Sequence, residues 1–554
     1  MKVNGGRAVV EVMAKEGVKK AFCVPGESYL SVMDALYQHS EIELISARHE
    51  GGASFMAEGY AKASGEVGVC MATRGVGATN LAIGIHTAAQ DSTPLVALIG
   101  QVERPFKEKE AFQEVNLTGF FSHLCKWTVE IDRVERIPEL LQRAFHMARS
   151  GRPGPVLVSL PHDMLEDEAE LSIKPSYRSL PPQPHMEDVK QAIETLRNAK
   201  RPVLIAGGGV IHARSNRLLV QFAEAMKLPV VTAFRRFDAF PNSHPCYAGW
   251  LGFGTPQYLL DEIRDADVVL ALGTRFSQVG TQDYTLLSKN TKLIHVDICP
   301  DIFGKVYVPS LAIEADAKSF LEQALQAQGS DTSISNEDNV KELHDKYMEF
   351  SEPKPDYTED FVDMDGFMHD IAASLPKDTI ITNDAGNFFG WLSRYYRFEH
   401  ENTYVGPTSG AMGYGLPAAI GAKLAQPHKH VVSFSGDGGF MMTLQEIETA
   451  VRYKIPTISI VVNNNIYGTI RAHQERHFPN RVVGTDLSNP NFAELARLFG
   501  AHGEKVEKNS EFAPALQRAI ASGLPAVIEV TVNPKILSVG QDKKEVHEKL
   551  VSNK

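Results

Sequence analysis

The feature that most constrains the fold is the alternation of short apolar runs with segments of helical periodicity, repeated along the chain. The first of these apolar runs lie at residues 18–26, 42–47, 67–73 and 94–101. Strands that alternate with helices are typical of a parallel sheet covered by helices on both faces. The sequence therefore predicts an α/β protein built from doubly wound parallel sheets.

The length of 554 residues is too great for a single hydrophobic core. A proline-rich stretch at 174–185 and polar stretches at 329–339 and 351–360, with a charged helix between them, are typical of linkers. We therefore expect three domains, covering residues 1–172, 186–328 and 355–540. The first and third could share a layout.

Composition excludes several function classes. The net charge is −12, from 56 basic and 68 acidic residues without a block of like charge, so nucleic acid is not an expected partner. The five cysteines are scattered and contain no CxxC pair, which fits neither a zinc site nor a disulfide framework and favours a reducing compartment. The first residues lack the apolar core of a signal peptide, and no apolar run approaches membrane-spanning length. We expect a cytoplasmic, soluble protein without a membrane partner.

The stretch HVVSFSGDGGFMMTLQE, residues 430–446, places Asp437 among glycines directly after an apolar run. Taken alone, Asp and Gly here would indicate only a tight turn. The next apolar run, TISIVV, ends directly in Asn463 and Asn464. Open α/β sheets bind ligands at the carboxyl ends of their strands, so Asp437 and Asn464 are expected to meet there. Thr443 and Glu446 match a T-x-x-E capping box and predict the start of the following helix.

Asp437 and Asn464 offer oxygen atoms of the kind that Mg²⁺ prefers, and Mg²⁺ commonly shares phosphate oxygens. Gly436, Gly438 and Gly439 would let backbone amides approach an anion closely. The two features together predict a metal-bridged diphosphate. A GDG motif followed after 24 residues by an Asn pair is the thiamin-diphosphate fingerprint.

With these motifs the chain resembles the thiamin-diphosphate enzymes of the acetolactate synthase and pyruvate oxidase group, over nearly its whole length. The resemblance implies a pyrimidine-binding domain, a central Rossmann-like domain and a diphosphate-binding domain. It implies thiamin diphosphate and Mg²⁺ as cofactors, with the metal held by Asp437, Asn464 and the carbonyl of Ile466.

The resemblance also implies a catalytic glutamate, and RHEGGASFMAEGYAKASG places Glu50 in that position. Without this context Glu50 would be a solvated acid favoured by a helix N-terminus. In the family this carboxylate hydrogen-bonds N1′ of the aminopyrimidine, which lets the cofactor's own amino group take the C2 proton. The adjacent Gly51, Gly52 and Ala53 leave room for a flat ring.

Further cofactor contacts are implied by the same resemblance. In GPTSGAMGYG, backbone atoms of Gly410 and Met412 would bind the pyrimidine edge, and Met412 would support the bent cofactor; otherwise Met412 would be core filling. In NDAGNFFG, Asn387 would contact the diphosphate. It stands where acetolactate synthases usually have Gln, and Phe388 replaces a His.

The segment EAFQEVN matches the acetolactate synthase pattern that directs Phe112 and Gln113 toward the reacting carbon, and we expect a catalytic role for Gln113. Lys126 also matches a lysine of the family.

The chain departs from acetolactate synthases where they select the second 2-oxo acid. Val279 stands at the position of an Arg, and His473 at that of a Trp, so a carboxylate-bearing acceptor loses its charge-matched partner. The usual SGPG turn reads RGVG, so Arg74 could take over an anion contact.

The central glycine cluster AGGGVI is not a full dinucleotide motif, and GWLGFGTP differs from the flavin-binding stretch of acetolactate synthases. FAD remains an open alternative for this domain.

The resemblance implies a 2-oxo acid decarboxylase and carboligase, in which a C2 carbanion attacks a 2-oxo acid, CO₂ leaves, and the enamine passes to an acceptor carbonyl. Simple decarboxylation, cleavage of a hydroxy ketone or diketone, a flavin oxidase and a non-catalytic thiamin-diphosphate binder remain alternatives. Because family architecture sets the Glu50 domain of one chain against the Asp437 domain of another, a homodimer or homotetramer is expected.

Overall fold

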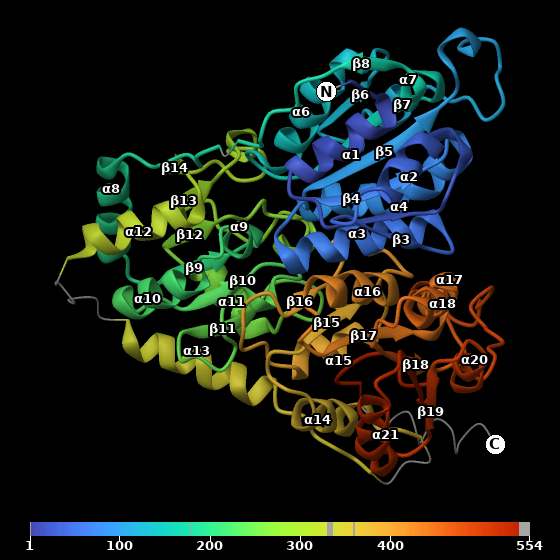
Figure 1. Ribbon diagram of the computed structural model, residues 1–554. Coiled ribbons are helices and arrows are strands. Elements are labelled where there is room, and N and C mark those ends of the chain that lie inside the picture. Colours follow the sequence, from blue (N-terminus) through green and yellow to red (C-terminus); the bar gives the residue numbers. More distant parts are fainter. Residues whose placement is uncertain (1, 178, 330–335, 358–360, 542–554) are drawn as a thin grey trace.

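Three six-stranded sheets, each surrounded by helices, make up the computed structural model of this chain (Figure 1). The structure describes residues 2–177, 179–329, 336–357 and 361–541. Pairing within each six-stranded sheet is parallel, as between β5 and β7, β9 and β12, and β17 and β18. The predicted α/β class with three doubly wound parallel sheets is confirmed.

The first sheet carries the N-terminal strands. They are β2 (Lys20–Cys23), β3 (Glu43–Ser46), β4 (Gly68–Ala72), β5 (Leu95–Gln101), β6 (Trp127–Glu130) and β7 (Pro155–Pro161). Its helices are α1 (Gly5–Lys15), α2 (Leu30–Tyr37), α3 (Glu50–Ser64), α4 (Gly75–Asp91), α5 (Leu117–Phe121), α6 (Ile137–Arg149) and α7 (His162–Glu166). An antiparallel pair, β1 (Lys2–Asn4) with β8 (Glu168–Glu170), ties the start of the chain to the end of this unit.

The central sheet has strands β9 (Pro202–Ala206), β10 (Val230–Thr232), β11 (Tyr247–Trp250), β12 (Val268–Leu272), β13 (Lys292–Asp297) and β14 (Leu311–Glu314). Its helices are α8 (Met186–Arg197), α9 (Gly208–His212), α10 (Asn216–Met226), α11 (Gln257–Asp265) and α12 (Ala317–Gln328). The order β11-β10-β9-β12-β13-β14 is the 3-2-1-4-5-6 arrangement of dinucleotide-binding folds. The charged helix expected after it is α13 (Glu337–Phe350), whereas the linker residues 330–335 and 358–360 lie outside the described residues.

The third sheet has strands β15 (Ile380–Asn383), β16 (Tyr404–Val405), β17 (Val431–Gly436), β18 (Ile458–Asn463), β19 (His502–Val506) and β20 (Ala526–Thr531). Its helices are α14 (Met364–Ser374), α15 (Phe389–Tyr395), α16 (Gly415–Ala425), α17 (Asp437–Thr443), α18 (Glu446–Arg452), α19 (Gly468–His477), α20 (Phe492–Leu498) and α21 (Asn509–Ser522). Counted within each unit, the first and third sheets share the order 2-1-3-4-6-5, so the layout expected to be common to both is confirmed.

Short 3₁₀ helices interrupt the connections. They are η1 (Glu27–Tyr29), η2 (Arg104–Phe106), η3 (Val134–Arg136), η4 (Phe237–Ala239), η5 (Val279–Thr281) and η6 (Pro300–Ile302). Among the residues that the structure describes, no helix combines the length and apolar character needed to span a membrane.

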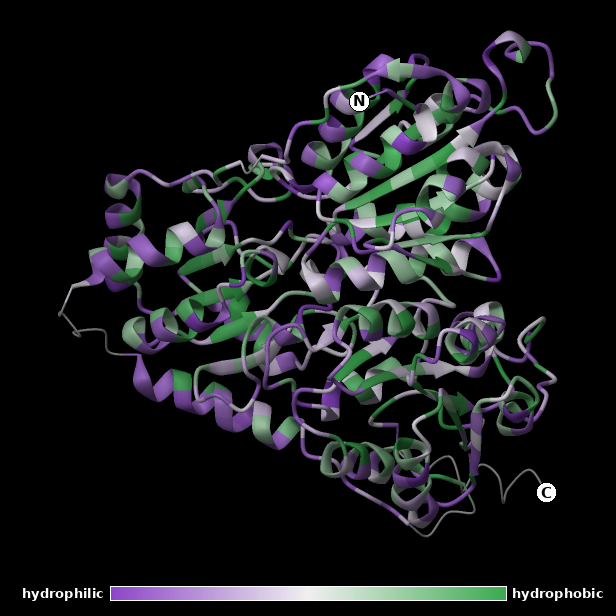
Figure 2. Cartoon of the chain, viewed as in Figure 1, coloured by the Kyte–Doolittle hydropathy of each residue, from purple (hydrophilic) through white to green (hydrophobic). Residues whose placement is uncertain are grey.

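The hydrophobic cores cross the boundaries between the units. Apolar strands lie inside and polar helix faces lie outside (Figure 2). Phe237 of the central unit stacks on Phe398 with ring centroids 5.6 Å apart, and it forms a T-shaped pair with Tyr404. Buried residues of the first and third units likewise form one cluster, in which Met56 and Phe440 take part. Burial of apolar area on this scale makes the three units one packed body.

The first and third units meet where α3 crosses α16, with the two helix backbones in contact (Figure 1). A Cβ atom on Gly421 would lie 2.0 Å from the carbonyl oxygen of Met56, and one on Gly59 would lie 2.5 Å from that of Ala418. Glycine at these two positions is therefore what allows the helices to approach so closely.

The predicted capping box at Thr443 and Glu446 is wrong. The helix that follows β17 already begins at Asp437, and the Thr443 hydroxyl donates to the carbonyl of Gly413 at 2.8 Å. Glu446 begins the separate helix α18, and its carboxylate accepts backbone N–H groups of Arg48 and His49 in the first unit. Tertiary partners outcompete the local cap at both residues.

We expect Gly421→Ala to destabilise the packing between the first and third units by about 1–3 kcal/mol, because the new methyl group overlaps the Met56 carbonyl. Thermal unfolding followed by circular dichroism would measure it. Gly119→Ala is the matched control, since the three atoms nearest to its Cβ position belong to the Asn116 side chain and lie no closer than 3.2 Å. Equal melting temperatures for the two variants would contradict a tight α3–α16 crossing.

Candidate active site

The carboxyl edge of the third sheet brings Asp437 and Asn464 together, as the sequence predicts. β17 and β18 are adjacent and parallel, with Gly436 opposite Val462. Asp437 follows β17 as the first residue of α17, and Asn464 is the first residue after β18. β15 is the other neighbour of β17, so Asp384 to Asn387 leave the sheet at the same edge.

Asp437 is held by a residue that sequence reasoning missed. The Asn489 amide nitrogen donates to Asp437 Oδ2 at 2.7 Å, and it lies 3.1 Å from each of the side-chain oxygens of Asn463 and Asn465. Burial raises the pKa of Asp437, while the N–H of Gly438 and the Asn489 amide oppose that rise. Asn489 lies in an ordinary polar segment, SNPN, and nothing in that pattern indicates its partners.

The other two expected metal ligands at this edge are neutral oxygen atoms. Asn464 Oδ1 accepts the N–H of Ile466 at 3.2 Å, and the Ile466 carbonyl accepts the N–H of Gly468 at 2.9 Å. Each oxygen keeps a second lone pair. One carboxylate with an amide and a carbonyl oxygen is a donor set that suits a hard divalent cation such as Mg²⁺.

Close protein packing disfavours a side chain at Gly438 and Gly439. A Cβ atom on Gly438 would lie 2.5 Å from the Tyr467 ring, and one on Gly439 would lie 2.5 Å from Asp384 Oδ2. Gly436 lies against the Phe388 ring, with its Cβ position 3.1 Å away. The sequence argument for these three glycines considered only the approach of an anion.

Asn387 and Asn464 line one small cavity of about 40 Å³ beside Leu537. The Asn387 amide donates to the Leu537 carbonyl at 2.5 Å. The structure therefore places Asn387 near Asn464.

The loop that carries Gly410 and Met412 lies between β16 and α16. Gly410 has φ +71°, a left-handed conformation that favours glycine, and the Ala411 carbonyl accepts the N–H of Ala385 at 3.2 Å. Helix α4 of the first unit contacts the start of the loop, where Thr87 and Ser409 hydroxyls lie 3.0 Å apart.

Glu50 and Gln113 lie together at the opposite end of α4. Glu50 is the first residue of α3 and accepts the amide of Asn80 at 2.9 Å, with its Oε1 3.1 Å from the Cβ position of Gly77. The Gln113 carbonyl accepts the N–H of Gly75 at 3.0 Å, and Gln113 has a strained φ of +62°. Among the described residues no hydrogen bond joins Glu50 or Gln113 to the Asp437 edge of the same chain.

Two neighbouring cations have protein partners. Arg74 pairs with Glu27 at 2.9 Å and donates to the Phe112 carbonyl at 3.2 Å, which anchors the loop of Gln113. The Lys126 ammonium donates to the carbonyls of Met147 and Ser150, at 2.6 and 2.8 Å, and so caps the end of α6. These contacts account for Lys126 as a structural residue.

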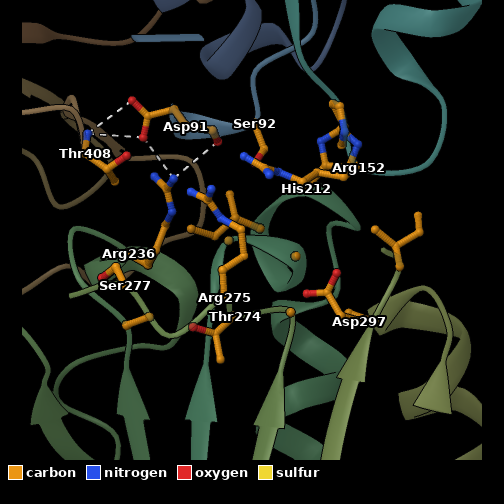
Figure 3. A pocket seen from close by; sticks show the side chains of 18 of the residues that line it. Asp91, Ser92, Arg152, His212, Arg236, Thr274, Arg275, Ser277, Asp297 and Thr408 are labelled. Atoms are coloured by element: carbon orange, nitrogen blue, oxygen red, sulfur yellow. Dashed lines mark hydrogen bonds and ion pairs between the residues drawn. The ribbon is translucent and has the colours of Figure 1, made fainter. Parts of the chain in front are cut away.

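A larger cavity of about 540 Å³ opens where the three units meet (Figure 3). Its floor includes Gly208 after β9 and Thr274 after β12, the point at which the strand order of the central sheet reverses. Ligands of doubly wound folds bind at such switch points. Val279 lines this cavity, whereas His473 lies on the exposed face of α19, so the two departures from the family pattern are not brought together in one chain.

Positive charge concentrates in this cavity. Arg152, Arg275 and Arg236 all line it. Burial, together with the charges of Arg152 and Arg236, lowers the pKa of Arg275 to about 10. Asp297, at the end of β13, has its pKa raised to about 6 by burial. Asp91 pairs with Arg236, whereas Arg152 and Arg275 have no ion pair among the described residues, and guanidinium groups at a switch point suit an anionic ligand.

Asp91 connects this cavity to the loop of Gly410 and Met412. It accepts the N–H of Thr408 at 3.2 Å and pairs with Arg236 at 2.9 Å (Figure 3). It also pairs with Lys62 at 3.0 Å. Although burial alone would raise the pKa of Asp91, Lys62 and Arg236 hold it down at about 2. One buried carboxylate therefore joins all three units.

Comparisons with known proteins match this architecture unit by unit. Residues 3–120 match the N-terminal TPP-binding domain of thiamine pyrophosphate enzymes, 189–324 their central domain, and 384–530 their C-terminal TPP-binding domain. The chain is 35% identical to a probable acetolactate synthase large subunit of Methanocaldococcus jannaschii, over 96% of this chain and 92% of that protein. It is 32% identical to the acetolactate synthase isozyme 2 large subunit of Escherichia coli, over 99% of this chain and 100% of that protein.

A thiamin-diphosphate-dependent enzyme of the transferase or lyase type is the class that the three domains define. Within it, the chain belongs to the family of the acetolactate synthase large subunits, as the resemblance of its motifs implied. It is an acetolactate synthase-like, thiamin-diphosphate-dependent carboligase.

Asp91→Ala should lower the free energy of unfolding by about 3–5 kcal/mol, because it leaves Lys62 and Arg236 buried without their carboxylate. Urea unfolding would measure the loss. Asp261→Ala is the control: it breaks the exposed pair with Arg264 on α11 and should leave the midpoint nearly unchanged. Similar midpoints for the two variants would show that the Asp91 pairs contribute no more than surface pairs.

Proposed function

We propose that this protein removes CO₂ from a 2-oxo acid and transfers the remaining acyl carbon to an acceptor carbonyl. The observation that carries the proposal is the meeting of Asp437 and Asn464 at one sheet edge, in a chain that also presents Glu50 at a helix start. Bound thiamin diphosphate supplies the electron sink for this chemistry, while the protein supplies orientation and proton control.

We propose Mg²⁺ as the metal, held by Asp437, Asn464 and the carbonyl of Ile466. The all-oxygen donor set and the support of Asp437 by Asn489 favour it. Backbone amides of Gly436, Gly438 and Gly439, with the Asn387 side chain, would hold the diphosphate beside the metal.

Glu50 is the proposed catalytic carboxylate. Its role is to hydrogen-bond N1′ of the pyrimidine and so control the proton on the cofactor's amino group. Gly410 and Met412 would bind and support the pyrimidine. Gln113, close to Glu50 at the start of α4, would face the bound substrate.

A homodimer or homotetramer fits this assignment, because among the described residues no hydrogen bond joins Glu50 to the Asp437 edge of its own chain. Exposed apolar side chains on α4 (Val76, Ile83) and on α17 (Met441, Met442) supply surfaces for a second copy. An active monomer on size-exclusion chromatography would contradict this arrangement.

The acceptor is the least constrained part of the reaction. Val279 and His473 provide no charge matched to a second carboxylate, so simple decarboxylation and cleavage of a hydroxy ketone remain the rival activities.

We also propose FAD for the cavity at the central switch point, on the strength of its arginines and its 3-2-1-4-5-6 sheet. A flavin absorption spectrum in the purified protein, or uptake of added FAD, would support it. Failure of the colourless protein to bind added FAD would reject it.

The domain boundaries 1–172, 186–328 and 355–540 and a cytoplasmic location complete the proposal. The β1–β8 pair closes the first unit at Glu170. The five cysteines, all within the described residues, are free thiols, which suits a reducing compartment.

CO₂ release from a panel of 2-oxo acids, pyruvate first, tests the activity with thiamin diphosphate and Mg²⁺ supplied. We expect CO₂ with a carboligation product, and a loss of turnover of about 10²–10⁴-fold in Glu50→Gln, because the amide cannot take part in the same proton transfer. Free aldehyde as the product would favour the decarboxylase, and absence of CO₂ the lyase. Full activity of Glu50→Gln would refute the role of Glu50.

Asn489→Ala should weaken activation by Mg²⁺ by about 10–100-fold, because Asp437 Oδ2 loses the amide that orients it. Titration of activity with Mg²⁺ at saturating thiamin diphosphate would measure the change. Asn491→Ala is the control, since Asn491 caps α20 through the N–H of Glu494 and does not reach Asp437. An unaltered Mg²⁺ titration in Asn489→Ala would place the metal elsewhere.

A further inference from the structure

Glu446 is a buried carboxylate that the proposed chemistry does not use. It begins α18 in the third unit, and its side chain reaches the first unit. Both of its oxygens lie 3.2 Å from the N–H of Arg48, and Oε1 also accepts the N–H of His49 at 3.1 Å. These N–H groups belong to the two residues directly before Glu50. Glu446 therefore binds the start of the helix that carries the proposed catalytic carboxylate.

The absence of a side chain at Gly52 leaves room for the Glu446 carboxylate. A Cβ atom on Gly52 would lie 2.4 Å from Glu446 Oε1 and 2.7 Å from its Cδ. Any larger residue at position 52 would push the carboxylate out of its place. The glycine at position 52 is thus explained by the Glu446 carboxylate of the third unit, as well as by room for a ligand.

The same helix holds the preceding residues of the first unit. Tyr453 Oη accepts the N–H of Ser46 at 2.9 Å and donates to the Leu44 carbonyl at 3.2 Å. The Arg452 guanidinium donates to the Ser46 carbonyl. Backbone atoms of the connection from β3 to α3 therefore make the hydrogen bonds to α18 and to Tyr453 directly after it.

Glu446 obtains its stabilisation from backbone dipoles and one hydroxyl. The Thr449 hydroxyl donates to its Oε2 at 2.7 Å. Burial raises the pKa of Glu446 to about 7, and the N–H groups of Arg48 and His49 oppose that rise. Because burial of a carboxylate costs free energy, the position of Glu446 points to a role in holding the backbone groups that it binds.

We propose that Glu446 is a positioning residue, which fixes the first turn of α3 from the third unit and thereby sets the place of the Glu50 carboxylate. Asn80 orients the Glu50 side chain, and Glu446 holds the backbone N–H groups of the two residues directly before Glu50. A displacement of about 1 Å at a reacting group can cost about 10²-fold in rate. This inference rests on the proposed role of Glu50.

The position of Glu50 can be read from exchange of the C2 proton of bound thiamin diphosphate with deuterium, measured by acid quench and NMR. We expect Glu446→Ala to slow this exchange about 10–100-fold while the dissociation constant of thiamin diphosphate changes less than about threefold. Glu446→Gln keeps one acceptor oxygen for the N–H groups of Arg48 and His49, and should recover most of the exchange rate.

Glu448→Ala is the matched control. Glu448 lies on the same helix and carries the same charge. It pairs with the Arg452 guanidinium at 3.2 Å and with the Arg48 side chain at 4.0 Å, but it makes no hydrogen bond to the Arg48 or His49 backbone. Its removal should leave C2 exchange unchanged. Gly52→Ala, which displaces the Glu446 carboxylate from the opposite side, should slow exchange as Glu446→Ala does, and it tests the proposal if Glu446→Ala does not fold.

A second readout needs no cofactor. Amide hydrogen exchange over residues 46–52 of the apo protein should be faster in Glu446→Ala than in Glu448→Ala. Wild-type C2 exchange in both Glu446→Ala and Gly52→Ala, with Glu50→Gln slow, would overturn the positioning role alone. Wild-type C2 exchange in Glu50→Gln would instead overturn the proposed function on which it rests.

Discussion

The crossing of α3 over α16 is the contact on which the rest of the arrangement depends. Gly59 and Gly421 let the two backbones touch, and no side chain separates them. α3 begins with Glu50, and α16 follows directly on the loop of Gly410 and Met412. A rotation of α3 would therefore move Glu50, and a rotation of α16 would move the loop of Gly410 and Met412. Because packed interfaces respond in discrete steps rather than by smooth deformation, this contact gives the two units one relative orientation.

Polar contacts between the units, close to the α3–α16 crossing, also help to fix this relative orientation. Glu446 holds the start of α3, and Asp91 holds the loop before α16 while it also pairs with Arg236 of the central unit. Both carboxylates are buried, and each is satisfied by partners from another unit. Buried charges stabilise little by themselves, but they strongly penalise arrangements that leave them unpaired. The result is a scaffold in which the chemistry of one unit is held in place by the others.

Several strand interiors and the placement of Asp437 and Asn464 after adjacent strands were predictable, and the reasons are local. β4, β5, β9 and β12 lie in the middle of their sheets and read as nearly continuous apolar runs, while β17 and β18 are apolar runs interrupted by serines. Edge strands such as β16 and β19 carry no such run and were not predicted. The capping box at Thr443 was predicted wrongly, because Gly413 and the first unit compete for its two members. Asn489, Asp91 and Glu446 had no local pattern that could reveal their partners.

By itself, the sequence determined the class of fold, the three units and the position of Asp437 and Asn464, because apolar periodicity and strand-end motifs act over a few residues. The tertiary structure decided which oxygens are already engaged, which glycines are required by packing, and which residues position others. Asn489 reaches Asp437 across 52 residues of chain, and Glu446 reaches His49 across 397. Contacts at such separations depend on how whole sheets pack, and no spacing within one segment encodes them.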